Sequence, residues 1–431
     1  MQRLARGGTS RPPDSDLTPG EQVADPLRHH QMLHVAPHGT VIYWQRHSKQ
    51  RWLKVQPSDL VEQLVSKQAA RKDRYLTVQQ FHGWRYVRLL KSLRCCYVDV
   101  DNCTDLPSVL EALDDQQLPH PSFAVYSGNG LHLYWLLEPT PAKALPVWQR
   151  MQDRLIRALE VLGADTRARD CTRVLRVAGS VHSGADVVAE GRILSGERWP
   201  FSLLANEVLG ERKPGHERRG KVRDIRTRQR TRSVSGGIYQ RWHLVYRDLI
   251  RIAEAQWWGG IPEGYRDTWV FLAANSLSWF AHPDAILYEI EAEAKRWTSL
   301  RTNEVRSAIS TVVRRAQQAA DGKTIQWQSR KIDPRYRFRR STLWSWCEGM
   351  IPQEIVPELR AIVPDEVAQQ RKRERDRARW RDSYTGEGHS ASRAADAATA
   401  RLMLAQGYSQ RAIARELEVN QSTVSRWLKQ G

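Results

Sequence analysis

The chain has 431 residues, with 67 Lys and Arg against 48 Asp and Glu, and a formal net charge of +19. Such a balance favours a polyanionic partner, and nucleic acid is the natural one. No apolar run reaches the roughly 18 residues that a membrane-spanning helix needs. The five cysteines include no Cys-x-x-Cys pair, which argues against a zinc site and a disulfide framework. We therefore expect a cytoplasmic protein of several domains, with reduced thiols and no membrane association.

The amino-terminal part divides into a leader and a first domain. Residues 1–30 are rich in Pro, Gly and charge and predict a disordered leader. In residues 31–208, a hairpin is expected at 34–44. Apolar spacing predicts three helices, at residues 57–70, 104–118 and 141–162. Because strands and helices interleave, this domain is predicted to have an α+β fold.

An acidic pair follows the strongest strand pattern of the chain. The apolar run Cys95–Val98 predicts a buried strand, and Asp99 and Asp101 follow it. Residues two apart on a strand point to the same face, so both carboxylates would project together. Two such carboxylates repel each other unless a cation lies between them, and hard divalent cations such as Mg²⁺ and Mn²⁺ prefer oxygen ligands.

The next strand pair encloses a glycine-bracketed turn. Ser127, Gly128, Asn129 and Gly130 separate two apolar runs, and His132 follows directly. Glycines permit a tight turn or a close approach of the backbone to a ligand. The imidazole of His132 could hydrogen-bond a phosphate oxygen.

A third segment adds one more acid and then basic residues. Asp165 is followed by Arg173 and Arg176, with His182 beyond, and Asp170 is a rival for the third acid. On a regular strand the two arginines would face opposite sides, so a shared pocket needs a bulge or a strand end there. Acids for metal and cations for a polyphosphate together favour nucleotidyl transfer.

These three segments resemble the catalytic core of the archaeo-eukaryotic primase superfamily, especially the primase-polymerases and the RepB-type plasmid primases. The resemblance implies an RRM-like α+β core with a largely antiparallel sheet. It implies that Asp99, Asp101 and Asp165 are the catalytic residues and the ligands of Mg²⁺ or Mn²⁺. The implied nucleotide-binding residues are Ser127, Asn129, His132, Arg173, Arg176 and His182. The last of these is His where the family more often has Lys.

Each motif alone also has an ordinary interpretation. An Asp-x-Asp pair is usually a solvated turn, and it also follows a strand in glycosyltransferases, where it holds a metal and a sugar nucleotide. Gly-Asn-Gly is more often only a hairpin turn. A lone His among apolar residues is more often a packed core residue. The order and spacing of all three motifs favour the primase interpretation.

The middle of the chain predicts a linker and a helical domain. Residues 209–236 are strongly basic and predict a linker; their near match to a phosphate-binding loop fails because Val222 stands where Ser or Thr is needed. Residues 237–365 predict a helical domain, with amphipathic stretches at Tyr239–Ala255 and Glu304–Ala320. The family resemblance implies that such a domain helps to bind template or the initiating nucleotide, and a packing role stays open.

The carboxyl-terminal part carries a second signal. Residues 366–392 form a charged linker, and residues 393–431 predict a helix-turn-helix with Ser409 as a helix N-cap. Leu402 and Val424 belong to its predicted core. The expected DNA-binding residues lie on its last helix: Gln421, Ser422, Thr423, Ser425 and Arg426.

The sequence therefore predicts a DNA primase, or primase-polymerase, of a plasmid or mobile element. Its expected partners are a single-stranded DNA template, nucleoside triphosphates, duplex DNA through the helix-turn-helix, and a separate replicative helicase. Two alternatives stay open. One is a DNA-binding initiator or regulator with an inactive primase fold, and the other is a metal-dependent glycosyltransferase.

Overall fold

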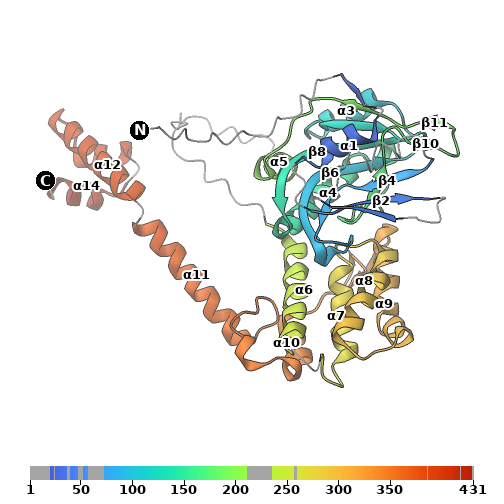
Figure 1. Cartoon of the computed structure of the whole chain (residues 1–431). Coiled ribbons are helices and arrows are strands. Elements are labelled where there is room, and N and C mark those ends of the chain that lie inside the picture. The colour runs from blue at the N-terminus through green and yellow to red at the C-terminus, as the bar shows by residue number, and fades with distance from the viewer. Residues whose placement is uncertain are drawn as a thin grey trace, which may run out of the picture. The chain divides into compact units, whose positions relative to one another are not determined.

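The computed structural model describes residues 20–23, 25–35, 39–46, 52–56, 72–210, 235–256, 260–385, 387–417 and 419–429. The chain forms two compact units, Met1–Ile362 and Val363–Gly431. The helix expected at 57–70 and most of the linker expected at 209–236 lie outside the described residues. The first unit contains the sheets and a group of helices, and the second is helical (Figure 1).

A six-stranded sheet forms the centre of the first unit. Its strand order is β1 (Gln22–Val23), β12 (Glu190–Ile193), β7 (Phe123–Tyr126), β8 (Leu131–Pro141), β6 (Leu90–Val100) and β5 (Gln80–Phe81). The long strands β6 and β8 are antiparallel and almost entirely buried, and Asp99 lies opposite His132. The continuous apolar runs of these strands reflect burial on both faces.

A four-stranded sheet accompanies the first. Its order is β3 (Trp52–Val55), β2 (Val41–Gln45), β4 (Arg74–Thr77) and β9 (Val174–Arg176). A short antiparallel pair, β10 (Val181–His182) and β11 (Val187–Val188), follows β9. The hairpin expected at 34–44 is wrong, because β2 pairs with β3 and β4 instead.

In the part of the chain that the structure describes, four α-helices pack against these sheets or connect their strands. They are α1 (Pro26–Leu33), α3 (Leu106–Asp115), α4 (Leu145–Ala158) and α5 (Phe201–Leu209). The leader expected at 1–30 is too long, because β1 and most of α1 lie within it. The His29 ring of α1 packs against Phe123 and Tyr134 of the sheet. The side-chain amide of Gln152 in α4 hydrogen-bonds both the N–H and the carbonyl of Tyr97. These backbone groups of β6 lie beyond the short strand β5, which pairs only near Leu90 and Ser92.

The helical part of the first unit begins with α6 (Gly237–Ala255), as the apolar spacing predicts. The remaining elements are α7 (Arg266–Leu277), α8 (Pro283–Trp297), α9 (Thr302–Ala320), β13 (Ile325–Trp327), β14 (Arg330–Ile332) and α10 (Arg340–Cys347). Helices α7, α8 and α9 pack side by side (Figure 1). The helical part also contacts the sheet-containing part: Glu289 of α8 accepts a hydrogen bond from the Val87 backbone, just before β6, at 2.9 Å, and Tyr239 of α6 donates to Asp153 of α4.

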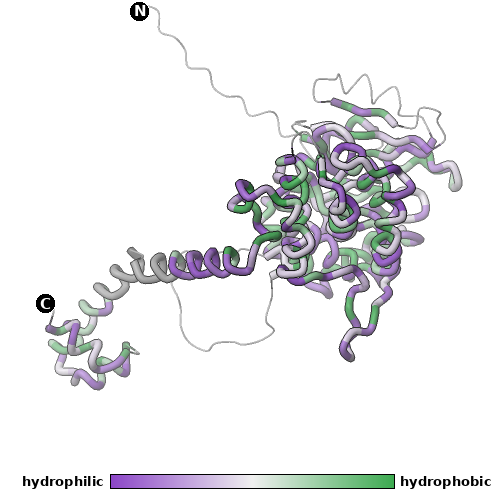
Figure 2. The backbone as a smooth tube through the Cα atoms, turned by 90° about the horizontal axis from the view of Figure 1, so that it is seen from below, coloured by the Kyte–Doolittle hydropathy of each residue, from purple (hydrophilic) through white to green (hydrophobic). Residues whose placement is uncertain are grey.

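The second unit consists of α11 (Asp365–Thr385), α12 (Glu387–Ala405), α13 (Gln410–Glu416) and α14 (Gln421–Lys429). The segment expected as a charged linker is thus helical, and α11 is hydrophilic in Figure 2. Ser409 caps α13 by accepting a hydrogen bond from the Ala412 amide, as predicted. The core of the second unit contains Ala400, Ile413, Ala414 and Val424. Leu402, predicted to be in this core, is 63% exposed.

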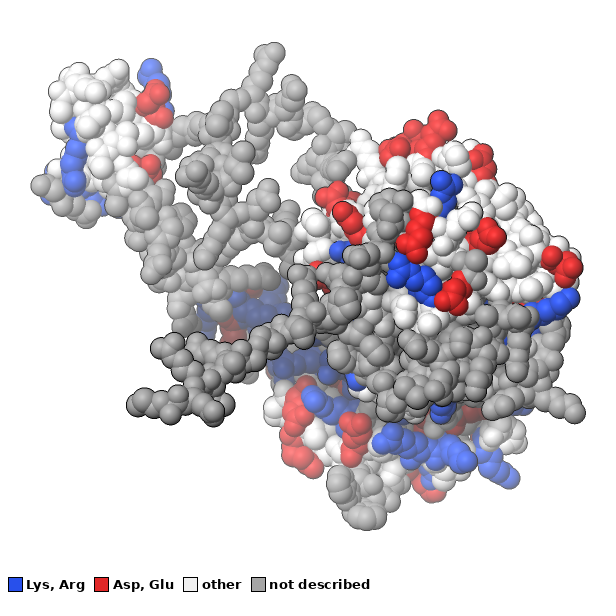
Figure 3. All heavy atoms as spheres, turned by 45° about the horizontal axis from the view of Figure 1, so that its top comes forward, with Lys and Arg blue, Asp and Glu red and all other residues white. Residues whose placement is uncertain are grey.

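Three features of the described residues concern the thiols, the apolar helices and the surface charge. All five cysteines are free thiols, and four of them are buried. Within the described ranges, no helix has the length and apolarity to cross a membrane. On the face drawn in Figure 3, acidic and basic side chains are interspersed, so the positive net charge does not form a uniform coat there.

Candidate active site

Two distant segments of the chain bring three acidic residues close together at the end of β6. The Asp165 amide donates a hydrogen bond to the Asp99 carbonyl at 2.7 Å, and the Asp101 amide donates to the Gly163 carbonyl at 2.9 Å. Ala164 forms an antiparallel bridge with Val100. The segment around residue 164 therefore extends the sheet along the end of β6 and carries Asp165 to the acidic pair.

Two glycines make this close approach possible. A Cβ atom on Gly163, which has φ of +95°, would collide with the carbonyl oxygen of Asp101. A Cβ on Gly130, at the start of β8, would collide with the carbonyl oxygen of Val100. The end of β6 thus lies between two backbone segments that only glycine can bring so near.

Electrostatic interactions link the three acids. Burial raises the pKa of Asp99 to about 6, and Asp165 adds to the rise, whereas Arg173 and Arg176 oppose it. Burial, Asp99 and Asp165 also raise the pKa of Asp101. The carboxylates repel one another, and the neighbouring arginines compensate this repulsion only in part.

His132 lies directly beside the acids. Its Nε2 is 3.5 Å from an Asp99 carboxylate oxygen, and its side chain is 7% exposed. Burial, with the nearby charges of Arg176 and Arg173, lowers the pKa of His132 to about 3. A neutral imidazole at this position can donate one N–H to a carboxylate or phosphate oxygen.

Arg173 reaches the site from the residue just before β9. Arg173 thus lies outside the regular strand and Arg176 is its last residue, so the two side chains are not bound to the alternating faces of a strand interior. The Arg173 Nη2 donates to the Arg167 carbonyl at 2.6 Å, and its Nε is 3.2 Å from a carboxylate oxygen of Asp170. Asp170 is 2% exposed and also accepts hydrogen bonds from the amide and hydroxyl of Thr172. Asp170 thus anchors Arg173, whereas Asp165 lies beside Asp99.

Arg176 is buried in an ion pair that the sequence did not reveal. Its Nη1 is 2.9 Å from a carboxylate oxygen of Asp73, and its Nη2 donates to the Tyr75 hydroxyl at 2.8 Å. Asp73 also accepts a hydrogen bond from the Ser183 amide. Arg176 therefore contributes charge to the site from a fixed position, with two of its nitrogens already bound within the protein.

The remaining predicted nucleotide-binding residues shape the loops. The Ser127 hydroxyl donates to the Gly130 carbonyl at 3.2 Å and closes the turn, at whose tip Asn129 is exposed. His182 uses Nδ1 to accept hydrogen bonds from the Gly184 and Ala185 amides. The ring of His182 also lies where a Cβ on Gly128 would be, so the two loops are in contact.

The donor set suits a hard divalent cation. The backbone brings three acidic residues together, and burial together with the repulsion between their carboxylates raises the pKa of Asp99 and Asp101, a cost that a bound cation would offset. Among the described residues, no three His, Cys, Asp or Glu side chains are already positioned to hold a metal ion together. A cation would thus bind through some of these oxygens and complete its shell with water or substrate oxygens.

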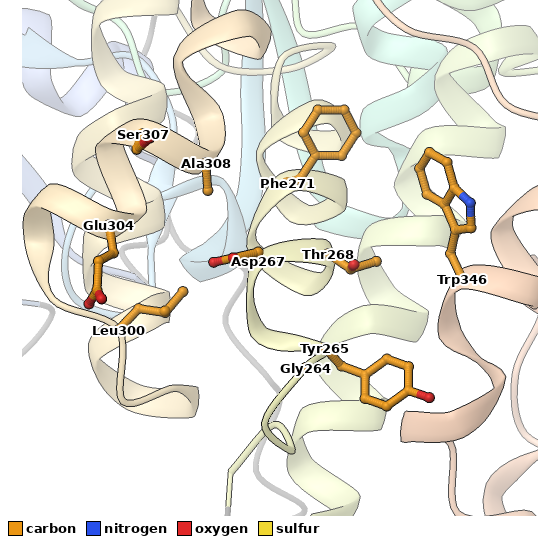
Figure 4. Close-up of a pocket in the computed structure, with 10 residues that line it drawn as sticks. All are labelled: Gly264, Tyr265, Asp267, Thr268, Phe271, Leu300, Glu304, Ser307, Ala308 and Trp346. Carbon is orange, nitrogen blue, oxygen red and sulfur yellow. The ribbon is translucent and has the colours of Figure 1, made fainter.

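A separate cavity of about 680 Å³ lies in the helical part, between α7, α9 and α10 (Figure 4). Its lining combines the aromatic residues Tyr265, Phe271 and Trp346 with the acids Asp267 and Glu304. Among the residues that the structure describes, no Lys or Arg lines it. This composition does not suit a triphosphate, which needs cationic partners.

In the second unit, α14 presents the residues predicted to read DNA. Gln421, Ser422 and Arg426 are exposed, and Thr423 and Ser425 are half-buried, while Val424 is in the core. A family model described as "Helix-turn-helix domain" matches residues 398–431. The carboxyl-terminal unit contains a helix-turn-helix domain.

A curated relative and two solved structures are similar to this chain. A protein of Clostridium perfringens described as "Replication protein" is 30% identical over 208 residues, which are 46% of this chain and 48% of the relative. The chain thus spans about half the length of that relative. The AEP domain of the cyanophage S-2L primase-polymerase is 24% identical, covers 42% of this chain and 96% of its own, and has a TM-score of 0.34. The primase RepB′ is 13% identical, covers 68% and 97%, and has a TM-score of 0.29. Both solved structures are of primases.

Several contributors to the site gave no signal in the sequence. Asp73 and Tyr75 hold Arg176 from about a hundred residues away, and Asp170 was considered only as a rival metal ligand. The two closely spaced glycines Gly128 and Gly130 did predict the turn before His132. No comparable pattern marked Gly163.

Proposed function

We propose that this chain is a DNA primase, which joins nucleotides on a single-stranded DNA template without a pre-existing primer. The convergence of Asp99, Asp101 and Asp165 at the end of β6, beside Arg173 and Arg176, is the observation that carries this proposal. A carboxylate cluster next to fixed guanidinium groups is the equipment that nucleotidyl transfer needs.

Each group would have a separate role. Asp99, Asp101 and Asp165 would hold Mg²⁺ or Mn²⁺, which would supply Lewis-acid stabilisation of the reacting phosphate. Arg173 and Arg176 would place positive charge against the triphosphate, and His132 would donate its Nε2–H to a phosphate oxygen. Asp170 supports the choice of Asp165 as the third acid, because its carboxylate is buried against Thr172 and Arg173.

The reaction forms one bond and breaks another. The 3′-oxygen of one nucleotide bonds to the α-phosphorus of the next, and the bond from that phosphorus to the pyrophosphate oxygen breaks. The 3′-hydroxyl proton passes to solvent, and pyrophosphate leaves. Ser127, whose hydroxyl closes the turn before His132, would keep that loop in position during the exchange.

The helix-turn-helix would bring the enzyme to duplex DNA. Exposed Gln421, Ser422 and Arg426 on α14 suit contacts in a major groove. The similarity to a protein described as a replication protein supports a replication role, and we propose a plasmid or mobile element as its setting. A separate helicase would open the duplex.

The test is synthesis from no primer, on single-stranded DNA with labelled nucleotides and Mn²⁺ or Mg²⁺. Wild type is expected to form template-dependent products, and Asp99→Asn is expected to form none. Asp115→Asn, at an exposed carboxylate that ends α3, is the matched control and should retain synthesis. Products from folded Asp99→Asn at the wild-type level would refute the proposal.

A DNA-binding initiator with an inactive primase fold is the second candidate. The observation in its favour is that Arg176 already binds Asp73 and Tyr75 with two nitrogens. That protein would bind a specific duplex and incorporate no nucleotide with either cation, so the same assay separates the two.

A further inference from the structure

A β-hairpin follows α9 and stands apart from both larger sheets. Strands β13 and β14 pair only with each other among the described strands, with Trp327 opposite Arg330. Gln328 and Ser329 form the turn, with φ of 43° and 62°. Two successive left-handed residues are the geometry of a tight two-residue hairpin turn, so the strand register is well specified.

The hairpin surface is basic and carries an exposed aromatic ring. Trp327 is 61% exposed. Arg330 lies directly across the ladder from it and therefore on the same face, and Lys331 lies on the opposite face. From Gly322 to Ile332 the chain has three Lys and Arg and no acid. An indole beside a guanidinium suits an unpaired base and its phosphate.

The base of the hairpin is tied to the segment that carries the third acid. The Thr166 hydroxyl donates to the Ala320 carbonyl at 3.3 Å, and Arg167 forms an ion pair with Asp321. Thr166 and Arg167 directly follow Asp165. Six residues of extended chain span about 20 Å, so Trp327 lies no farther than about that from Asp321.

We propose that the hairpin Ile325–Ile332 binds the single-stranded DNA template beside the active site, with Trp327 stacking on a base and Arg330 and Lys331 contacting phosphates. The reason for single-stranded rather than duplex DNA is that stacking on an indole requires an unpaired base. The template role rests on the proposed primase function, whereas the binding itself does not.

The test is the affinity of the full-length chain for a labelled single strand of about 12 nucleotides, near the site size of known single-strand grooves. Fluorescence anisotropy is measured without nucleotide or divalent cation, and excess unlabelled duplex occupies the helix-turn-helix. Trp327→Ala is expected to weaken binding by about 5- to 100-fold. Trp327→Phe should retain most of the affinity because it keeps an aromatic face. Leu203→Ala, an exposed apolar residue of α5, is the matched control and should bind as wild type.

The two basic residues of β14, one on each face of the hairpin, are tested by a second measurement. Arg330→Ala/Lys331→Ala should flatten the salt dependence of single-strand binding by about 1.4 in the log–log slope, because two phosphate contacts are lost. Lys143→Ala, at an exposed lysine of the first unit, should leave the slope unchanged.

Two results would overturn the proposal. One is wild-type affinity and salt slope in the Trp327 and Arg330/Lys331 variants. The other is an unchanged affinity with a shift from oligomer to monomer by analytical ultracentrifugation, which would assign the hairpin to pairing with a second copy. Failure of the primase proposal is distinguishable: wild type would then make no product while the hairpin variants still lose single-strand binding.

Discussion

Replacing Asp99 by Asn is expected to make the protein more stable while it removes activity. Burial raises the pKa of this carboxyl from its ordinary value of 3.8 to about 6. The protonated Asp99 carboxyl therefore contributes fully to the free energy of unfolding below pH 3.8, and this contribution is lost as the pH rises through 6. At about 1.4 kcal/mol per pH unit, the ionised wild type is less stable than its protonated form by about 3 kcal/mol at pH 7.5. Asn cannot ionise and avoids this cost.

The assay is urea unfolding of wild type and Asp99→Asn at pH 7.5 and at pH 4, without divalent cation. The variant should gain up to about 3 kcal/mol at pH 7.5, and the difference should shrink toward zero near pH 4. Mn²⁺ should then stabilise the wild type and not the variant. Asp115→Asn is the control and should show neither effect. A variant that is less stable than wild type at pH 7.5, or a gain that is the same at both pH values, would refute the reasoning.

Three further predictions address the surroundings of the site and the second unit. Asp73→Ala leaves Arg176 buried without its carboxylate, so the free energy of unfolding should fall by about 3–5 kcal/mol in urea; a loss below about 1 kcal/mol would contradict a buried pair. Burial lowers the pKa of His29 and of His132 to about 3, so the stability that these neutral rings contribute is present above pH 6.5 and falls toward pH 4 by about 1.4 kcal/mol per pH unit for each. His29→Gln should reduce that slope, and an unchanged slope would argue against the assignment. Arg426→Ala should weaken duplex binding and lower its salt slope by about 1, and an unchanged slope in an electrophoretic titration would exclude a phosphate contact.

The sequence was informative where chemistry and local geometry coincide. Asp99 and Asp101 follow a continuous apolar run, which marks a buried strand, and the glycines before His132 mark a turn. Helices α6, α9 and α13 were also predictable, because apolar spacing and an N-cap are local patterns that a few neighbouring residues define. The convergence of Asp165 with the first two acids, by contrast, came from the family resemblance, and the structure places its backbone against that of Asp99.

Long-range pairing explains what the sequence did not reveal. Arg176 was predicted to bind nucleotide, but nothing local indicates that Asp73 and Tyr75 hold two of its nitrogens. The sequence alone allows two interpretations of Arg85, Arg88, Lys91 and Arg94: a template path or, slightly favoured, a solvated helix face. Instead Arg94 is fully buried in β6 and donates to the Leu33 carbonyl, and Arg88 pairs with Glu293 of α8. Each correction depends on a partner at least 60 residues away in the chain.

The proposed active site depends most on Asp165 acting together with Asp99 and Asp101. The most direct measurement is the formation of the first dinucleotide from two nucleoside triphosphates on single-stranded DNA with Mn²⁺, comparing wild type with Asp165→Asn. We predict that the wild type forms the dinucleotide and that folded Asp165→Asn forms none, while Asp115→Asn matches the wild type. Dinucleotide formation at the wild-type rate by Asp165→Asn would contradict the three-acid site.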